Sequence, residues 1–489
     1  MKGDRIFSLV LTLLLLLLFV HPIDTDGDFF QHVNIGRYVV THHALPRADD
    51  LTFTAAGRPY VGYAWLSGVL FYFVYKTMGA VAINILVLSI ALLTFWLLYR
   101  YLRGIGVPHK LSLLTILVIA PVVASRWPTR PEIFMYPIFL GFLLLDEAKR
   151  RHFWMIWFYP LLMLLLVNMY GSSFPFAAGL LVLLAVKNWL EGERRAGYYE
   201  ALTISFPVAV INGYGLKSLL FIFLIPNMTT LWGDWIGLLE ILRRPEINYP
   251  WEITVMYCLF IAYVVALSIW LKGRLRKLWL FVLLALTVFV PFLAVRMRTL
   301  AAIFASPLIG LLLLRSRSRW AGFATLALSL VTIVLCVVFT NLPAFGEHTA
   351  VFPPELIRFI KTYDIRGNVF NTPRIGSFLS YYLSPSVRVF SDTRDDLFVN
   401  TGVLEAEQAF LSQGASIVYL LAKYHVDFVV VNLADGDSFR DLLYDPSWSL
   451  VYFADNYLIF MPRTVAIAKH LSTFDTLDPY GPNGVKRVL

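Results

Sequence analysis

Long apolar runs separated by short loops occupy most of the first 341 residues of this 489-residue chain. Most of these runs approach the length of about 20 residues that an α-helix needs to cross a bilayer. Hydrophobic residues make up 58% of the sequence and charged residues 15%. A soluble domain has about 45–50% and about 25%, respectively. We therefore expect a polytopic α-helical membrane protein.

Hydropathy predicts about eleven transmembrane helices. The expected spans are residues 6–22, 80–101, 111–126, 133–146, 153–169, 174–190, 199–213, 251–271, 278–295, 299–314 and 320–341. The first span has the basic start and short apolar run of a signal peptide. Its end, His21-Pro22-Ile23, lacks the small residues of a cleavage site, so we expect a retained anchor.

Basic residues follow alternate spans, and this pattern predicts the orientation of the chain. By the positive-inside rule, the N-terminus is cytoplasmic, and the loop at residues 23–79 and the chain after Asn341 lie outside the plasma (inner) membrane. The net charge of +9 arises largely from these loops, whose basic residues are expected to contact membrane lipids. A nucleic-acid partner is not expected, because the basic residues are not gathered in one groove.

The chain after the last span has a different pattern. Segments rich in β-branched and aromatic residues predict strands at Val369–Asn371, Val387–Ser391, Asp427–Asn432 and Tyr457–Met461. Helices are predicted at Pro354–Tyr363, Ile375–Leu383 and Val403–Tyr424. The expected division is a transmembrane module at 1–343 with a large first outer loop at 23–79, an extracytoplasmic α/β domain at 344–466, and a loosely ordered tail at 467–489.

Three aspartates at alternate positions follow the first span: Asp24, Asp26 and Asp28. Close carboxylates repel one another unless a cation, a basic group or a shared proton relieves the repulsion. Their oxygens suit Mg²⁺, Mn²⁺ or Ca²⁺, and one carboxylate could instead act as a general base. The alternative is a helix N-cap with solvated acids, since a helix is expected at Phe29–Val40.

Two further residues of the first loop are candidates for binding a substrate. His32 lies one helical turn beyond Asp28, so the two side chains can share a helix face. A hydrogen-bonded structural histidine is the alternative. Asp49 precedes Asp50 in the run Pro46-Arg47-Ala48-Asp49-Asp50, where a turn and cap would explain both acids without a ligand.

Arginines also occur at predicted outer ends of spans, where the positive-inside rule expects few. They are Arg126, Arg130, Arg296 and Arg298. The planar guanidinium makes paired hydrogen bonds to phosphate, so these residues are candidates for binding an anion. Pairing with lipid head groups is the alternative.

Acids and arginines on one membrane face suit transfer of a sugar from a lipid-linked phosphate. The phosphate leaving group needs charge neutralisation, which arginines or a metal ion provide, and the attacking hydroxyl needs a base. A transporter would more often hold its carboxylates near the middle of the membrane.

The first loop also resembles a group of bacterial membrane proteins. The similar segments are Asp26-Gly27-Asp28-Phe29-Phe30-Gln31-His32, Gly36-Arg37, Leu45-Pro46-Arg47-Ala48-Asp49, Gly57-Arg58-Pro59-Tyr60 and Trp65-Leu66. Further similarity lies at Arg130-Pro131-Glu132, Asn212-Gly213-Tyr214-Gly215, Arg296 and Val389-Phe390-Ser391-Asp392-Thr393-Arg394. The group is identified as part of the GT-C superfamily of polyprenyl-phosphate-sugar glycosyltransferases. Tyr170 and Gly213 depart from it, standing where histidine and proline are usual.

The resemblance implies a GT-C-like fold and an inverting glycosyltransferase that uses a polyprenyl-phosphate sugar donor and an extracytoplasmic acceptor. It implies a catalytic or metal-binding role for Asp26 and Asp28, with Mg²⁺ or Mn²⁺ as the expected ion. The arginines Arg126, Arg130, Arg296 and Arg298 are then expected to hold the lipid phosphate, and His32 and Asp49 to orient the acceptor. A flippase or exporter of lipid-linked glycans, and a non-catalytic scaffold of the cell envelope, are the alternatives.

Overall fold

The computed structural model of the chain describes residues 2–20, 22–23, 27–224, 237–243, 251–270, 284–285, 297–316, 319–339, 346, 351–412, 416–435 and 439–474. The chain divides into two compact units. The first comprises residues 1–22 and 80–345, and the second comprises residues 23–79 and 346–489. The first loop therefore belongs to the same unit as the C-terminal region.

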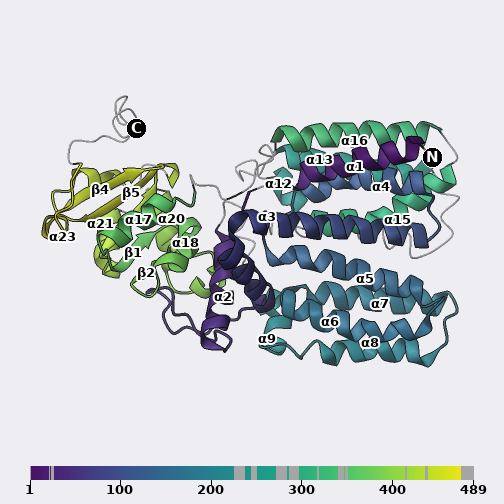
Figure 1. Cartoon of the computed structure of the whole chain (residues 1–489), viewed down its shortest axis with the longest axis horizontal. Helices are drawn as coiled ribbons and strands as arrows, with labels where there is room; N and C mark the ends of the chain where they lie inside the picture. The colour runs from purple at the N-terminus through teal and green to yellow at the C-terminus, as the bar shows by residue number, and fades with distance from the viewer. Residues whose placement is uncertain are drawn as a thin grey trace. The chain divides into compact units, whose positions relative to one another are not determined.

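The described part of the first unit is helical (Figure 1). Its longer helices are α1 (Lys2–Phe19), the second part of α3 (Trp65–Gly104), α4 (His109–Ala124), α5 (Met135–Ala148), α6 (Phe158–Met169), α7 (Phe174–Leu190), α8 (Ala196–Val208), α13 (Trp251–Trp270), α15 (Arg298–Ser316) and α16 (Arg319–Phe339). Short helical segments are η1 (Pro131–Phe134), η2 (Phe153–Trp157), η3 (Gly171–Ser173), α9 (Leu216–Leu219), α10 (Phe221–Leu224) and α12 (Leu238–Arg243). Helices satisfy their own backbone hydrogen bonds, as a lipid environment requires.

Five of the helical segments in the described residues are long and apolar enough to cross a membrane. They are Trp65–Gly104, Gly171–Leu190, Glu252–Ile269, Arg298–Ser316 and Trp320–Val337. Shorter apolar helices cover Ser8–Phe19, His109–Ala124 and Phe153–Met169. Nearly all of the span expected at residues 278–295 lies outside the described residues. The total of about eleven spans therefore stays a prediction.

Helix α4 lies at the centre of one group of helices in the first unit. It packs against α1, α15 and α16, which lie beside it in Figure 1. An unbroken run of its side chains, Thr115–Val123, is buried. A helix that is apolar on all sides is expected to be surrounded by other helices, and α4 has this position.

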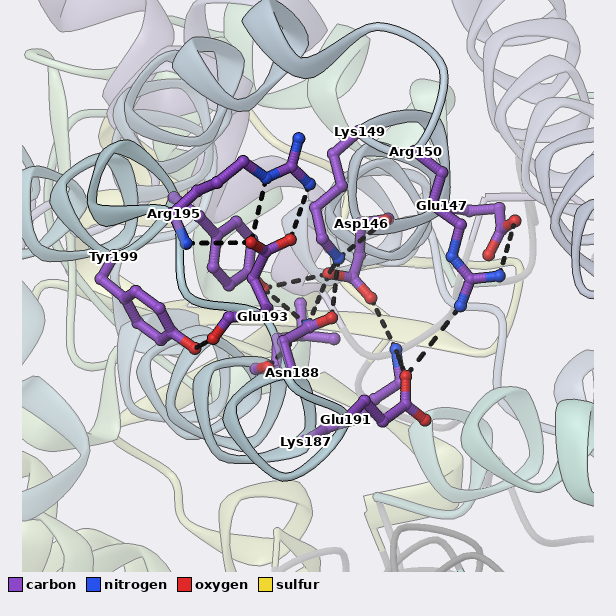
Figure 2. A network of polar contacts seen from close by, with 12 residues as sticks. Asp146, Glu147, Lys149, Arg150, Lys187, Asn188, Glu191, Glu193, Arg195 and Tyr199 are labelled. Carbon is purple, nitrogen blue, oxygen red and sulfur yellow. Dashed lines mark hydrogen bonds and ion pairs between the residues drawn. The ribbon is translucent and has the colours of Figure 1, made fainter.

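A buried polar network joins α5, α7 and α8 in the first unit (Figure 2). Asp146 of α5 is its centre: it accepts hydrogen bonds from Lys149, from Lys187 at 2.7 Å, from Asn188 at 2.8 Å and from the hydroxyl of Tyr198 at 3.0 Å. Lys149 also donates to the side-chain oxygen of Asn188, at 2.8 Å. Each charge in this group therefore has several partners within the protein.

The second unit contains a five-stranded sheet with the order β2-β1-β3-β5-β4. The strands are β1 (Gly367–Asn371), β2 (Val387–Val389), β3 (Phe428–Asn432), β4 (Trp448–Ala454) and β5 (Tyr457–Pro462). β1 pairs in parallel with β2 and β3, and β5 pairs antiparallel with β3 and β4. Four strands lie where the sequence predicts them. β4 was not predicted, although the left-handed residues Asp455 and Asn456 between β4 and β5 are typical of a hairpin turn.

Helices α2 (Asp28–His42), α17 (Pro354–Thr362), α18 (Pro373–Leu383), α19 (Asp395–Phe398), α20 (Val403–Leu411), α21 (Ile417–Tyr424), α22 (Arg440–Tyr444) and α23 (Arg463–Ala468) complete the second unit, with the first part of α3. The prediction of one helix over Val403–Tyr424 is wrong. The helical run ends at Leu411, and Ser416 is extended before α21 begins.

The first loop is built into the second unit through α2 and an added strand segment. Gly36 of α2 meets Gly68 of α3, where a methyl group on Gly36 would overlap the Gly68 carbonyl. Next to β2, the backbone N–H of Val389 donates to the Leu51 carbonyl at 3.3 Å, and that of Phe53 donates to the Val389 carbonyl at 3.1 Å. The loop therefore extends the sheet at its β2 edge.

Candidate functional site

Asp28 lies at the N-terminus of α2. It is the first residue of the helix, and Gly27 before it has a left-handed conformation with φ of 86°. A side chain at Gly27 would overlap the backbone carbonyl of Arg374, so glycine is required at this position. The positive end of the helix dipole favours the Asp28 carboxylate. Asp24 and Asp26 lie outside the described residues, so the role of Asp26 stays a prediction.

Asp395 of the second unit lies close enough to Asp28 for their charges to interact, and two further buried acids, Asp396 and Glu407, lie near Asp392. Burial raises the pKa of Asp395 well above its ordinary value, and the charges of Glu407 and Asp28 add to this effect. Burial also raises the pKa of Asp396 to about 7 and that of Glu407 to about 8. Near neutral pH, Glu407 is therefore mostly protonated and Asp396 is about half protonated.

His32 is buried in the interface between α2 and the first part of α3. Its ring packs edge-on against Tyr63 with 6.4 Å between ring centroids. Its carbonyl lies against Gly68 in the close helix contact described above. His32 is one turn from Asp28, as the sequence predicts for two residues on the same helix face. Its role towards an acceptor stays a prediction.

The Asp49 carboxylate is buried and accepts four hydrogen bonds. Three come from its own loop: the backbone N–H groups of Leu51 at 3.2 Å and Thr52 at 3.1 Å, and the Thr52 hydroxyl at 2.6 Å. The fourth comes from Arg394, at 2.6 Å. These partners hold the first loop on the C-terminal part of the second unit.

Arg394 is the centre of this buried ion group. Its Nε and one terminal nitrogen donate to both oxygens of Asp392, at 2.6–3.0 Å. Its guanidinium also lies over the Tyr60 ring, 5.0 Å from the ring centroid. Burial lowers the pKa of Arg394, but Asp392 and Asp49 outweigh this, and the net pKa lies well above its ordinary value. Arg394 therefore stays charged and its charge is neutralised locally.

The arginines predicted to hold a phosphate lie in the first unit, where the end of α4 meets the start of α15. Arg298 donates to the hydroxyl of Ser125 at 2.9 Å and to its carbonyl at 2.7 Å. Thr299 donates to the carbonyl of Arg126 at 3.0 Å. Arg298 and Arg126 are thereby brought to the same site from helices far apart in the sequence.

An acid accompanies these arginines. Arg126 pairs with Glu132 at 3.4 Å, and both side chains are at least nine-tenths buried. Arg130 lies in the same α4–α5 connection, directly before η1. The described part of this site therefore combines guanidinium groups with a carboxylate that pairs with one of them. Arg296 lies outside the described residues.

The expected divalent cation is not tested by this arrangement. Within the described residues, no group of three or more His, Cys, Asp and Glu side chains is placed to hold a metal ion. Asp26, the expected partner of Asp28, is not among those residues. A metal held by these two aspartates stays a prediction.

No protein-family model matches the chain, and no curated protein matches it in sequence. Its fold is similar to that in the crystal structure of ArnT from Cupriavidus metallidurans bound to undecaprenyl phosphate. The alignment has a TM-score of 0.52 and covers 94% of this chain and 98% of that chain, with 11% sequence identity. ArnT is a GT-C aminoarabinose transferase. The chain has a GT-C-type fold.

The similarity of fold agrees with the GT-C-like fold that the resemblance of the first loop implies. Within this fold the structure assigns contacts to residues that had no predicted role. Glu132, Asp392 and Arg394 lie in segments quoted for the resemblance, so the sequence did contain a signal for them. Asp395 and Glu407 had none, because their placement depends on how α19 and α20 pack.

Proposed function

We propose that the protein is a glycosyltransferase that moves a sugar from a polyprenyl-phosphate-linked donor to an acceptor outside the plasma (inner) membrane. The GT-C-type fold over 94% of the chain carries this proposal, because the similar protein was solved with undecaprenyl phosphate bound. The N-terminus is then cytoplasmic and the second unit extracytoplasmic. The acceptor is a glycan, a lipid or a protein.

The donor phosphate would bind the arginines at the α4–α15 junction. Arg126 and Arg298 are already fixed there by contacts with Glu132 and Ser125, so little reorganisation is needed when an anion arrives. Arg130, and Arg296 beyond the described residues, would add further donors. Preorganised donors of this kind stabilise the negative charge that grows on a leaving phosphate.

The reaction would proceed in one displacement with inversion. The acceptor oxygen forms a bond to the anomeric carbon, and the bond from that carbon to the phosphate oxygen breaks. The electron pair of the broken bond stays on the lipid phosphate, and the acceptor proton passes to a carboxylate. Asp26 or Asp28 would be this base, a contribution of about 10²–10⁴ in rate.

The surroundings of Asp28 support a carboxylate in this role. The helix dipole favours its anion, and burial raises the pKa of the neighbouring Asp395 carboxyl. His32, one turn further along α2, would orient the acceptor. Asp49 would act by positioning the first loop, because its carboxylate already has four donors.

A divalent cation, Mg²⁺ or Mn²⁺, is the proposed cofactor. One of Asp26 and Asp28 would hold it while the other accepts the proton. When bound, it would neutralise part of the charge on the donor phosphate. Incubation with EDTA is expected to reduce transfer, and added Mg²⁺ or Mn²⁺ to restore it. Full activity after chelation would show that transfer needs no divalent cation, and the proposed role of the arginines would be unaffected.

Transfer from undecaprenyl-phosphate-linked sugars by Asp26→Asn and Asp28→Asn variants tests the proposed base. Loss of at least one hundredfold is expected in one of the two, on the order of the effect of a general base. Glu405→Gln, at an exposed glutamate of α20, is the matched control and is expected to transfer normally. Normal turnover in both aspartate variants, with the fold intact, would refute the assignment.

A further inference from the structure

A cavity of about 330 Å³ lies entirely within the second unit. One side of α2 forms a wall, with Gln31, Asn34, Tyr38 and His42 at helical spacing. The first loop and the segment after β2 form the other walls. This volume is near the lower end of the range for small-molecule sites, about 300–1,000 Å³.

The cationic side chains of the cavity already have partners. Arg37 donates to the carbonyls of Ser380 and Tyr381, at the C-terminal end of α18. Arg394 is bound by the carboxylates of Asp392 and Asp49. Both cations are thus engaged by acceptors of the protein, and the cavity is poorly suited to a phosphate or another anion.

The acceptors of the cavity, in contrast, have unused capacity. Asn34 is 4% exposed and donates to the Ser377 carbonyl at 2.9 Å, which fixes its amide. Its side-chain oxygen is buried without a hydrogen-bond partner among the described residues. An unsatisfied buried acceptor is costly, so a group that donates a hydrogen bond to Asn34 would be favoured.

Asp50 supplies a second acceptor, whose side chain is exposed and feels the charges of Arg394 and His42. Its carboxylate lines the cavity, and no lysine, arginine or histidine in the described part of the chain lies within ion-pairing distance of it. The neighbouring Asp49, by contrast, has its four donors. The two adjacent acids of the first loop therefore differ: one closes the fold and the other faces the cavity.

An aromatic pair borders the same cavity. The rings of Tyr38 and His42 stack with their centroids 4.2 Å apart and their planes at 19°. Aromatic faces carry partial negative charge and attract the weakly positive C–H groups of a ligand. Aromatic faces beside free acceptors suit a ligand that combines C–H surface with many hydroxyl groups.

We propose that this cavity binds a saccharide, whose hydroxyl groups donate to Asn34 and Asp50 while its ring lies against Tyr38. The identification of this saccharide as the glycan acceptor rests on the proposed glycosyltransferase activity. A more open hollow of about 650 Å³ shares Tyr38, Ala48 and Asp50 with the cavity. The combined groove has room for an oligosaccharide, so the proposed acceptor is a glycan chain rather than a single sugar.

Binding of the purified full chain to an array of di- and trisaccharides built from hexoses, N-acetylhexosamines and pentoses tests the proposal. The wild-type chain is expected to retain a subset of these saccharides. Asp50→Asn and Tyr38→Ala are each expected to weaken binding of that subset by about tenfold or more, the scale of one charged hydrogen bond or one aromatic contact. Among the described residues, neither side chain has a hydrogen bond or ion pair to α18 or to the sheet.

Matched controls are Glu405→Gln for the acid and Tyr419→Ala for the aromatic residue, which is 64% exposed on α21. Both are expected to bind as wild type does. Retention of no saccharide by the wild-type chain, or equal retention by Asp50→Asn, Tyr38→Ala and the controls, would overturn the proposal. Saccharide binding without any sugar transfer would refute the proposed function and leave the binding site. Sugar transfer by the wild-type chain, together with saccharide binding that neither Asp50→Asn nor Tyr38→Ala weakens, would support the proposed function and refute the binding site.

Discussion

Two polar groups of this protein, the Asp146 network and the wall of the cavity beside α2, differ in how fully their hydrogen bonds are used. In the network of the first unit, Asp146 accepts from two lysines, an amide and a phenol (Figure 2). In the cavity of the second unit, Asn34 keeps a buried oxygen without a partner among the described residues. Asp50 likewise has no cation paired to it there.

The difference separates a structural group from a candidate binding site. Both groups contain buried charges, so burial of charge does not by itself distinguish a structural group from a binding site. A saturated network stabilises one arrangement of helices and gives a ligand nothing to bind. A cavity wall with available hydrogen-bond acceptors, whose cations already have partners, favours a ligand that donates hydrogen bonds.

Asp146→Asn is expected to give the largest loss of stability. It removes the carboxylate that pairs with the buried Lys149 and leaves Lys187 with the longer contact to Glu191, and loss of a buried ion pair costs about 3–5 kcal/mol. Thermal unfolding in detergent, followed by loss of helical circular dichroism, measures it. Saccharide binding by the folded fraction should not change. An unfolding midpoint equal to that of the wild type would show that the network is not structural.

Arg126→Gln is expected to reduce sugar transfer by about 10²–10³, because one preorganised donor to the leaving phosphate is lost. The variant also removes the ion pair between Arg126 and the buried Glu132, so loss of folding must be separated from loss of chemistry. Arg126→Gln combined with Glu132→Gln removes both charges of this pair. The double variant should regain stability and remain slow. Recovery of transfer in it would contradict the role of Arg126.

The stability of the second unit is expected to rise as the pH falls from about 8 to about 6. Burial raises the pKa of Glu407 to about 8 and that of Asp396 to about 7. The unfolded chain releases these protons near pH 4, so the folded unit binds more protons in this window. Each group that is protonated only when folded contributes roughly 1.4 kcal/mol per pH unit.

Hydrogen exchange of amides in β1 and β3, measured across this pH range after correction for intrinsic rates, would show the trend. Glu407→Gln is expected to flatten it, because the amide does not titrate. Protection that instead increases with pH would mean that these acids are not held in their protonated form.

Asp50→Asn is expected to have the smallest effect on stability, within about 0.5 kcal/mol, because its carboxylate holds no other part of the fold. Its effect should appear in saccharide binding alone. Asp49→Asn is the informative neighbour, since it weakens the contact with Arg394 and should destabilise the second unit. Equal destabilisation by the two variants would remove the difference between these adjacent acids.

Periodicity and hydropathy predicted the elements whose signals are local. The helix at Phe29–Val40 is present as α2, and four of the five strands lie at their expected positions. β4 was missed because it depends on its hairpin with β5, and the expected helix at Val403–Tyr424 is interrupted before Ser416. Both errors concern segments whose structure is decided by tertiary packing.

The sequence predicted which residue types form the candidate site, but it predicted less well which side chains contact one another. The sequence singled out Asp49 as a possible acceptor contact, but its salt bridge to Arg394 joins residues 345 positions apart. The free oxygen of Asn34 likewise depends on α18, which orders its amide. No local pattern reports such long-range contacts. The arginines were identifiable because the positive-inside rule gave a reason to expect none at their positions.

The most direct test of the proposed function is the release of undecaprenyl phosphate by the purified chain in lipid nanodiscs. The donors would be undecaprenyl phosphate carrying a hexose, an N-acetylhexosamine or a pentose, with a mixed oligosaccharide acceptor pool, and mass spectrometry would follow the lipid. We predict acceptor-dependent conversion of at least one donor to undecaprenyl phosphate, with the sugar on the acceptor and conversion reduced by Arg126→Gln. Intact donors throughout, in a protein shown to be folded, would contradict the account.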